Sequence, residues 1–137
     1  MSIPDEFLYE YAVVRYVPRV DREEFINIGL IMMCKRRRWL RGDIRLNETR
    51  IKAFAPTADL KFIANQASIF MRDDIPSPDI PVEERYRWLA ATKSAVLQVS
   101  PSHPGLLPEY EDGVKNSLTP FERLNNEFER LFNELIS

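Results

Sequence analysis

The sequence contains few of the residues from which metal and redox sites are built. Its 137 residues include one cysteine, Cys34, and one histidine, His103. A single cysteine cannot form a disulfide within the chain, and a zinc site needs several cysteine or histidine ligands at close spacing. We therefore expect Cys34 to be a small buried apolar side chain, and we expect neither a metal site nor a cofactor.

Glycine is also scarce, and long hydrophobic runs are absent. The four glycines are widely separated, which excludes a glycine-rich loop that cradles phosphate. The longest nearly apolar run, Ile26 to Cys34, falls well short of the roughly 20 residues that span a bilayer. No basic flank precedes an apolar stretch at the N-terminus, so no secretory signal is visible. These absences predict a cytoplasmic protein without a membrane segment.

The charge balance is close to neutral. The formal net charge is −2, with 45% hydrophobic and 29% charged residues. This composition is ordinary for a folded protein, and the chain is long enough for one core but not for two. The general basic field of many nucleic-acid-binding proteins is absent. We expect a single domain over residues 1–137.

The hydrophobic pattern predicts an α+β fold, with an antiparallel sheet of about four or more strands packed by about three helices. Short connections between three successive strand patterns favour antiparallel pairing. The first strand is apolar on both faces, which predicts a central strand, and the third alternates with charges, which predicts one wet face. We predict strands over residues 8–17, 25–34, 40–46 and 94–99, helices over residues 57–71, 82–91 and 119–136, and irregular structure over residues 101–117.

The last predicted helix has the clearest signature. Thr119, Pro120 and Glu122 form a capping-box sequence, in which side chains satisfy the free N–H groups of the first turn. The apolar stripe that follows must be buried against the sheet or a partner chain. This stripe and the prospective edge strands favour a homodimer. The stripe consists of Phe121, Leu124, Phe128, Leu131, Phe132 and Leu135.

Two polar segments, residues 15–29 and 87–105, join charged turns to apolar runs and form the candidate binding surface. Arg15 and Asn27 are expected to project from neighbouring strands toward a shared surface. In the alternative interpretation the charges solvate a hairpin turn, while Asn27 and Gly29 mark a bulge or a close backbone approach. The candidate binding residues are Arg15, Arg19, Arg22, Asn27, Lys93, Gln98, Ser100 and His103.

An enzymatic site is a weaker hypothesis. His103 titrates near neutrality without help, so a small hydrolase or nucleic-acid-processing enzyme could use it with nearby carboxylates. However, adjacent glutamates point apart in a strand, no glycine-flanked nucleophile is present, and a rigid proline-rich loop explains the composition around His103. The sequence therefore favours a protein that is not an enzyme. The catalytic candidates are His103, the carboxylates Glu23, Glu24 and Glu111, and the hydroxyls Ser100 and Ser102.

The run from Lys35 to Trp39 raises a third hypothesis, nucleic-acid binding. Arg36, Arg37 and Arg38 could grip phosphate while Trp39 stacks on a base. Like charges at a hairpin tip also prevent edge-to-edge pairing of sheets. Because no second basic patch accompanies the run, nucleic acid is the less favoured partner.

Five segments of the chain carry a resemblance to a known family: Tyr9–Pro18, Arg22–Gly29, Arg87–Leu89, Ser94–Gly105 and Phe128–Phe132. Through them the chain resembles a bacterial family of uncharacterised proteins, the domain of unknown function 3037. The resemblance covers nearly the whole chain, and the order of its segments makes it fairly specific. It departs from the family pattern at Thr92, where proline is frequent, and at Lys93, where arginine is frequent. A lysine weakens a bidentate contact because a single ammonium cannot fork.

The resemblance implies a partner rather than a reaction. The family has no established activity, so it transfers no catalytic residue to this chain. Genes for similar proteins often sit beside genes for HipA-like serine/threonine kinases, the toxin-type kinases of bacteria. The leading hypothesis is therefore a non-enzymatic interaction or accessory module with a toxin–antitoxin association, whose partner is a HipA-like kinase.

Overall fold

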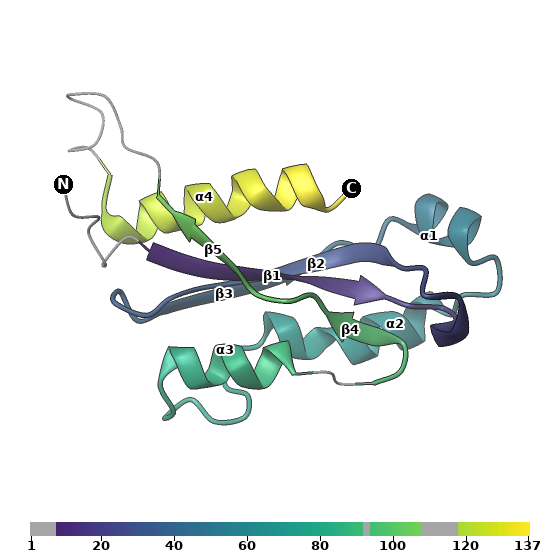
Figure 1. Cartoon of the computed structure of the whole chain (residues 1–137), viewed down its shortest axis with the longest axis horizontal. Helices are drawn as coiled ribbons and strands as arrows, with labels where there is room; N and C mark the ends of the chain where they lie inside the picture. The colour runs from purple at the N-terminus through teal and green to yellow at the C-terminus, as the bar shows by residue number, and fades with distance from the viewer. Residues whose placement is uncertain (1–7, 92–93, 108–117) are drawn as a thin grey trace.

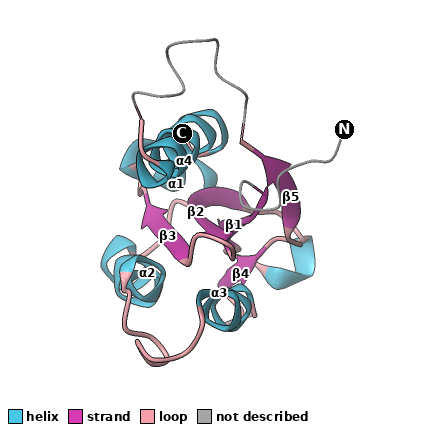
Figure 2. Cartoon of the chain, turned by 90° about the vertical axis from the view of Figure 1, so that its left-hand side faces the viewer, coloured by secondary structure: helices cyan, strands magenta, loops and turns pink. Residues whose placement is uncertain are grey.

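The computed structural model of the chain describes residues 8–91, 94–107 and 118–137 and confirms the α+β fold. Its strands are β1 (Leu8–Tyr16), β2 (Ile26–Cys34), β3 (Trp39–Ile44), β4 (Leu97–Val99) and β5 (His103–Leu106). Its α-helices are α1 (Glu48–Phe54), α2 (Leu60–Ala67), α3 (Val82–Ala90) and α4 (Pro120–Leu135). Two 3₁₀ turns, η2 (Val20–Arg22) and η3 (Ser68–Met71), complete the described elements. In Figures 1 and 2, α4 lies on one face of the sheet and α2 and α3 lie on the other.

The five strands form one antiparallel sheet in the order β3-β2-β1-β4, with β5 also paired to β1. β2 occupies one edge of β1 along its length. The opposite edge is shared, because β4 pairs with Val14–Tyr16 and β5 pairs with Leu8–Tyr11. β1 is therefore the central strand, as its two apolar faces predicted.

β1 contributes to two separate cores. Ala12, Val14 and Tyr16 face a cluster that also receives residues of α1, α2 and α3, here called the α3-side core. Tyr9 and Val13 face the cluster beneath α4, here called the α4-side core. The alternation of side chains along a strand explains this division, since successive residues point to opposite faces. The two-sided burial predicted for the first strand is confirmed.

A bulge in β2 lies at the polar end of the hairpin. The register shifts between Val14 and Arg15, so that Val14 pairs with Gly29 and Arg15 pairs with Asn27. A Cβ on Gly29 would lie 2.7 Å from the carbonyl oxygen of Asp43, so this position requires glycine. The predicted bulge and close backbone approach at Asn27 and Gly29 are both present.

The stripe of α4 packs on the sheet of its own chain. The capping box is confirmed, because the Thr119 hydroxyl accepts the Glu122 N–H at 3.1 Å and the Glu122 carboxylate accepts the Thr119 N–H at 3.4 Å. Leu124 is the first stripe residue buried in the α4-side core, whereas Phe121 in the first turn is 52% exposed. The predicted stripe was therefore one turn too long. The homodimer stays a prediction, with edge strands as its remaining argument.

The predicted wet face of the third strand is partly covered by α4, since Arg45 is exposed while Arg41 and Asp43 are half-buried. The guanidinium of Arg41 lies over the Phe128 ring at 4.3 Å, and that of Arg45 lies over the Phe132 ring at 4.6 Å. Arg41 also forms an ion pair with Glu129 at 2.6 Å. Arginine can cover apolar rings with its stem and its planar head while its N–H groups reach polar partners. Arg41 in β3 and Arg45 just after it thus contact the helix while they remain accessible to water.

Two elements were not predicted. α1 begins after Asn47, whose side chain accepts the Arg50 N–H at 3.1 Å, but the helix has only seven residues and a short pattern. β5 falls within the stretch predicted to be irregular, since Pro104 lacks an N–H and resembles a loop residue. β5 is a strand because the first half of β1 offers it a free edge.

Other boundaries differ from the prediction for local reasons. The predicted helix over residues 57–71 divides into α2 and η3. The fourth strand is shorter, because the Ser94 hydroxyl accepts the N–H groups of Val96 and Leu97 and holds a turn there. Cys34 is buried as predicted.

A buried carboxylate, Glu127, ties α4 to β1. The Tyr9 hydroxyl donates to one oxygen of Glu127 at 2.5 Å, and Arg130 Nε donates to the other at 2.7 Å. Glu127 is 4% exposed. Burial alone would raise the pKa of the Glu127 carboxyl, but the hydrogen bonds from Arg130 and Tyr9 outweigh it and lower that pKa from its ordinary value of 4.5. Burial, followed by the bond to Glu127, raises the pKa of Tyr9.

Replacing Tyr9 with Phe removes one hydrogen bond to a buried carboxylate. We expect the free energy of unfolding at neutral pH to fall by about 1.5–3 kcal/mol in chemical denaturation. Because the carboxyl pKa is lower in the folded chain, its stabilisation is complete above the ordinary carboxyl range and is lost as the pH falls through the folded pKa. Tyr9→Phe should lose less stability than the parent between neutral and acidic pH.

Tyr11→Phe is the matched control, since Tyr11 lies two residues away and its hydroxyl makes no hydrogen bond to a described residue. Its effect should stay within about 0.5 kcal/mol. Equal stability of the two variants would contradict a stabilising role for the Tyr9–Glu127 bond.

Candidate functional site

The sheet brings three of the predicted binding residues into one row. Arg15 on β1 lies opposite Asn27 on β2 and opposite Gln98 on β4. Directly opposed residues of antiparallel strands share a face, and this is the face on which α4 lies. The Asn27 amide reaches the end of that helix and donates to the Leu135 carbonyl at 3.4 Å. The row thus begins where α4 ends.

Arg15 is held by an aromatic ring and not by an acceptor. Its guanidinium lies 4.1 Å from the centroid of the Phe25 ring. Its Nε is buried and has no hydrogen-bond partner among the described residues, and no described carboxylate forms an ion pair with it. A buried donor without an acceptor is uncommon in folded proteins. The arrangement leaves the Nε–H of this arginine without an acceptor among the described residues.

A pocket of about 340 Å³ opens beside this arginine and is here called the Arg15 pocket. The turn that follows β1 forms one wall. η2 ends at Glu23, whose φ of 54° is in the left-handed region and whose N–H bonds to the Val20 carbonyl at 3.2 Å. Two apolar side chains of the wall are exposed, Val20 by 53% and Phe25 by 44%. The pocket is lined by Arg15, Val17, Val20, Glu23, Phe25 and Gln98.

Arg19 and Arg22 occupy a different place from Arg15. Arg19 forms an ion pair with Asp21 and Arg22 with Glu24, each at 2.6 Å. Both arginines line a second pocket of about 310 Å³ beside α1 rather than the Arg15 pocket. Their charges are balanced by their own sequence neighbours. The candidate catalytic residue Glu24 is therefore already engaged by Arg22.

The Ser100 hydroxyl both accepts and donates a hydrogen bond, in each case with the backbone. The oxygen accepts the Val13 N–H at 2.9 Å, and the hydroxyl donates to the Pro101 carbonyl at 2.9 Å. Ser100 is 5% exposed. It closes the gap between β4 and β5, where the edge of β1 would otherwise lose a hydrogen bond.

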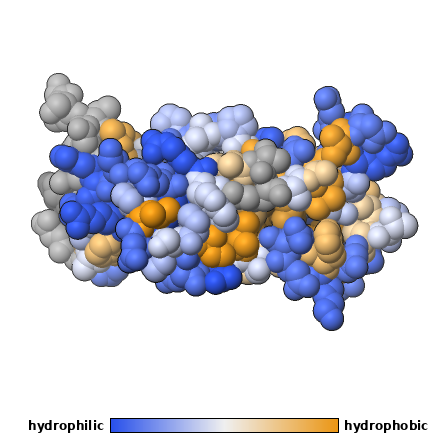
Figure 3. Space-filling model, turned by 90° about the horizontal axis from the view of Figure 1, so that it is seen from below, coloured by the Kyte–Doolittle hydropathy of each residue, from blue (hydrophilic) through white to orange (hydrophobic). Residues whose placement is uncertain are grey.

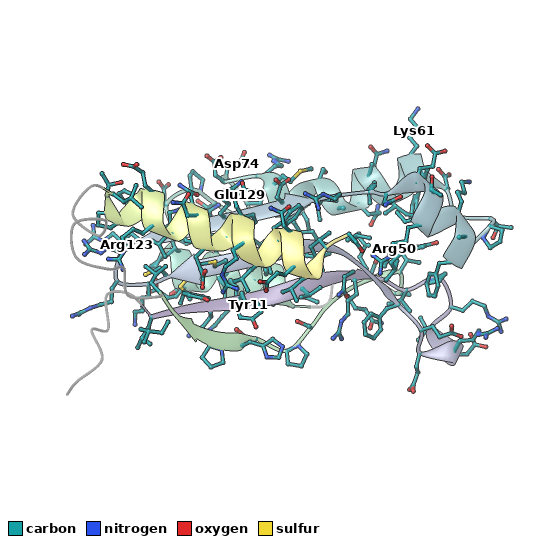
Figure 4. All side chains as sticks on the ribbon, turned by 90° about the horizontal axis from the view of Figure 1, so that it is seen from above. Tyr11, Arg50, Lys61, Asp74, Arg123 and Glu129 are labelled. Carbon is teal, nitrogen blue, oxygen red and sulfur yellow. The ribbon has the colours of Figure 1, made fainter. Side chains whose placement is uncertain are left out.

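His103 lies on β5, and its exposed ring packs against Tyr11 with 5.3 Å between ring centroids. In Figure 4, Tyr11 and Glu129 lie on opposite flanks of α4. No carboxylate or serine in the described ranges forms a hydrogen bond or ion pair with His103, and Glu23 faces the Arg15 pocket instead. Lys93 and Glu111 are outside the described residues.

The basic turn between β2 and β3 exposes no aromatic ring, because Trp39 is buried. Lys35, Arg36 and Arg38 are exposed, but Trp39 is 8% exposed and packs edge-on against Phe128 in the α4-side core. The ring that was predicted to stack on a base packs instead against the middle of α4. Within the Lys35–Trp39 run, Lys35, Arg36 and Arg38 are exposed and Arg37 is half-buried.

One polar cluster had no sequence signal. The Tyr86 hydroxyl lies 2.7 Å from the Ser102 hydroxyl, which donates to Glu10 at 3.1 Å. Burial is the main cause that raises the pKa of Tyr86 to about 12. The three residues come from α3, the β4–β5 connection and β1, so only the fold brings them together. Val20 and Phe25 could have been identified from the sequence, since they are apolar residues within a charged turn.

No three histidine, cysteine, aspartate or glutamate side chains among residues 8–91, 94–107 and 118–137 are grouped so as to hold a metal ion. No helix of this part of the chain combines the length and apolar content that crossing a bilayer requires.

The role of Ser100 can be tested by Ser100→Ala. We expect the free energy of unfolding to fall by roughly 1–3 kcal/mol, because the Val13 N–H is left buried without an acceptor. Gln98→Ala on the same strand is the control, since that half-exposed side chain makes no hydrogen bond to a described residue, and its effect should stay within about 0.5 kcal/mol. If Ser100→Ala is as stable as the parent in chemical denaturation, the hydroxyl has no structural role.

Comparison with known proteins places the chain by sequence. A family model described as "Protein of unknown function (DUF3037)" matches residues 11–119, which include the whole row of Arg15, Asn27 and Gln98. A search of curated proteins and a search of solved structures each found no match. The match spans well over half of the chain, and the chain therefore belongs to the DUF3037 family of proteins of unknown function.

Proposed function

We propose that this protein is a non-enzymatic interaction module that binds another protein through the surface around the β1–β2 turn. This surface, here called the turn surface, consists of Arg15, Val20, Phe25, Asn27 and Gln98. The observation that carries the proposal is the pair of exposed apolar side chains, Val20 and Phe25, beside an arginine that has no acceptor in the described chain. Aromatic and arginine side chains beside a pocket are typical of the residues that dominate binding energy in protein interfaces.

Apolar exposure alone would not distinguish this surface. The face of the molecule in Figure 3 also exposes apolar residues, in several separate patches among hydrophilic ones. Isolated exposed apolar residues are normal on protein surfaces. The turn surface differs because its apolar pair adjoins a pocket and a polar row that one partner could contact together.

The partner that we propose is a HipA-like serine/threonine kinase. The support for it is the resemblance of the chain to proteins whose genes often lie beside genes for such kinases. The protein would then act as an accessory or regulatory subunit.

The geometry favours neither alternative function. An enzyme based on His103 needs a carboxylate or hydroxyl within hydrogen-bonding reach, and no described residue supplies one. Nucleic-acid binding at the basic turn would depend on phosphate contacts alone, because Trp39 is buried.

Phe25→Ala tests the turn surface directly. We expect it to weaken a complex with a purified HipA-like kinase from the same genome by about tenfold or more, as isothermal titration calorimetry would measure, because aromatic anchors carry much of an interface's energy. Val20→Asp, which places a charge in the apolar wall, should weaken the complex similarly.

Phe62→Ala is the matched control. Phe62 is 48% exposed, close to the value for Phe25, but it belongs to α2 on the other side of the sheet. Equal loss of affinity in the two alanine variants would show that the contact is not at the turn surface. If the parent does not associate with the kinase at micromolar concentration, this partner is wrong.

A further inference from the structure

We propose that the Arg15 pocket binds a carboxylate group, supplied by an acidic side chain or the C-terminus of the protein partner. The proposal rests on the interaction function described above and names the chemical group that the turn surface recognises. The arginines on the α4 face of the sheet differ in whether their guanidinium groups have acceptors in the described chain.

Among the described residues, three arginines of this face lie over aromatic rings, and one of the three has no acceptor within that part of the chain. Arg41 lies over Phe128 and has an ion pair with Glu129 at 2.6 Å. Arg45 lies over Phe132 and donates to the Ile136 carbonyl at 2.8 Å and to the Asn133 side chain at 3.0 Å.

Arg15 lies over Phe25 at a similar distance, 4.1 Å, with no acceptor among the described residues. The same arginine–aromatic contact is thus accompanied by a described hydrogen-bond acceptor at Arg41 and Arg45, but not at Arg15. A guanidinium fixed in plane by an aromatic ring presents its N–H fork to a planar acceptor.

The Arg15 pocket is large enough to hold a small chemical group, and its lining includes both polar and apolar side chains. The pocket of about 340 Å³ has the size of a small ligand site. Gln98, directly opposite Arg15 in the β1–β4 ladder, adds a side-chain amide that can donate to the same acceptor. Val17 and Val20 supply apolar walls for a short hydrocarbon stem. The guanidinium of Arg15 and the amide of Gln98 can donate to a carboxylate, while the apolar wall can contact the short side chain that carries it.

The charge of the pocket favours a carboxylate over a phosphate. Arg15 is the only cationic side chain among the described residues that line the pocket, and Glu23 contributes a carboxylate of its own. A dianionic phosphate would meet one positive and one negative side chain, whereas a singly charged carboxylate needs a single guanidinium.

Glu23 would also act as a competitor for Arg15. Its φ of 54° is uncommon for a residue with a side chain, and such conformations persist where the surrounding structure holds them. The turn holds Glu23 on the wall of the pocket without an ion pair to Arg15. Removing its charge should therefore strengthen the binding of an external carboxylate.

Sodium acetate is the probe for the test, added to the full chain at constant ionic strength. We expect saturable shifts of the Phe25 backbone amide, the Gln98 side-chain amide and the Arg15 Nε–H in ¹⁵N-detected spectra. Arg15→Lys keeps the charge but loses the fork, and we expect affinity to fall by roughly tenfold. Glu23→Gln should raise affinity several-fold. Arg22→Gln is the control, since it removes an equal charge from an arginine already paired with Glu24 and should change nothing.

Two capped peptides then distinguish the source of the carboxylate. One is Ala-Glu-Ala blocked at both ends, and the other is acetyl-Ala-Ala with a free C-terminus. The peptide that binds more tightly identifies a side chain or a chain end as the natural group. Shifts that do not saturate, or that survive Arg15→Lys and respond equally to Arg22→Gln, would overturn the carboxylate site.

The kinase complex separates failure of this inference from failure of the proposed function. If Phe25→Ala weakens the complex and Arg15→Lys does not, the interface stands and the carboxylate inference falls. If acetate binds at Arg15 while Phe25→Ala leaves the complex unchanged, the pocket stands as a carboxylate site and the proposed interface falls.

Discussion

The structure depends on β1, which is hydrogen-bonded on both edges and buried on both faces. Its side chains alternate between the α3-side core and the α4-side core, so one strand contributes to the apolar clusters on both faces of the sheet. Its second edge is divided between β4 and β5, and the Ser100 hydroxyl supplies the hydrogen bond that the division leaves open. A strand with these constraints has little freedom in register, which places Arg15 accurately at its end.

Arginine–aromatic stacking has two uses on the α4 face. At Arg41 and Arg45 the rings belong to α4, and nearby acceptors complete the contact, so the arginines fasten the helix to β3. At Arg15 the ring belongs to the neighbouring turn, beyond the end of α4, and no described acceptor is supplied. The contacts that stabilise the fold and the proposed binding site therefore depend on the same kind of arginine–aromatic contact. They differ in whether the described chain itself provides an acceptor for the guanidinium.

The candidate site was partly predictable from the sequence. Arg15, Asn27 and Gln98 stand at strand ends, and position alone identified them. Ser100 and Trp39 were chosen for their chemistry, but the first closes a gap in the sheet and the second fills the α4-side core. A hydroxyl or an aromatic ring serves a backbone or a ligand equally well, so residue type could not decide between these roles. The acceptor left missing at Arg15 became visible only with the side chains in place.

The sequence by itself determined the α+β class, the central position of β1, the bulge at Asn27 and Gly29, and the capped start of α4. Each follows from a local signal, such as the period of apolar residues or a capping pair. Tertiary structure alone decided that β5 is a strand, that Arg41 and Arg45 contact aromatic rings of α4, and that Tyr86, Ser102 and Glu10 meet. These outcomes depend on which distant segment supplies a free edge, an aromatic ring or a hydroxyl, and no local pattern encodes that partner.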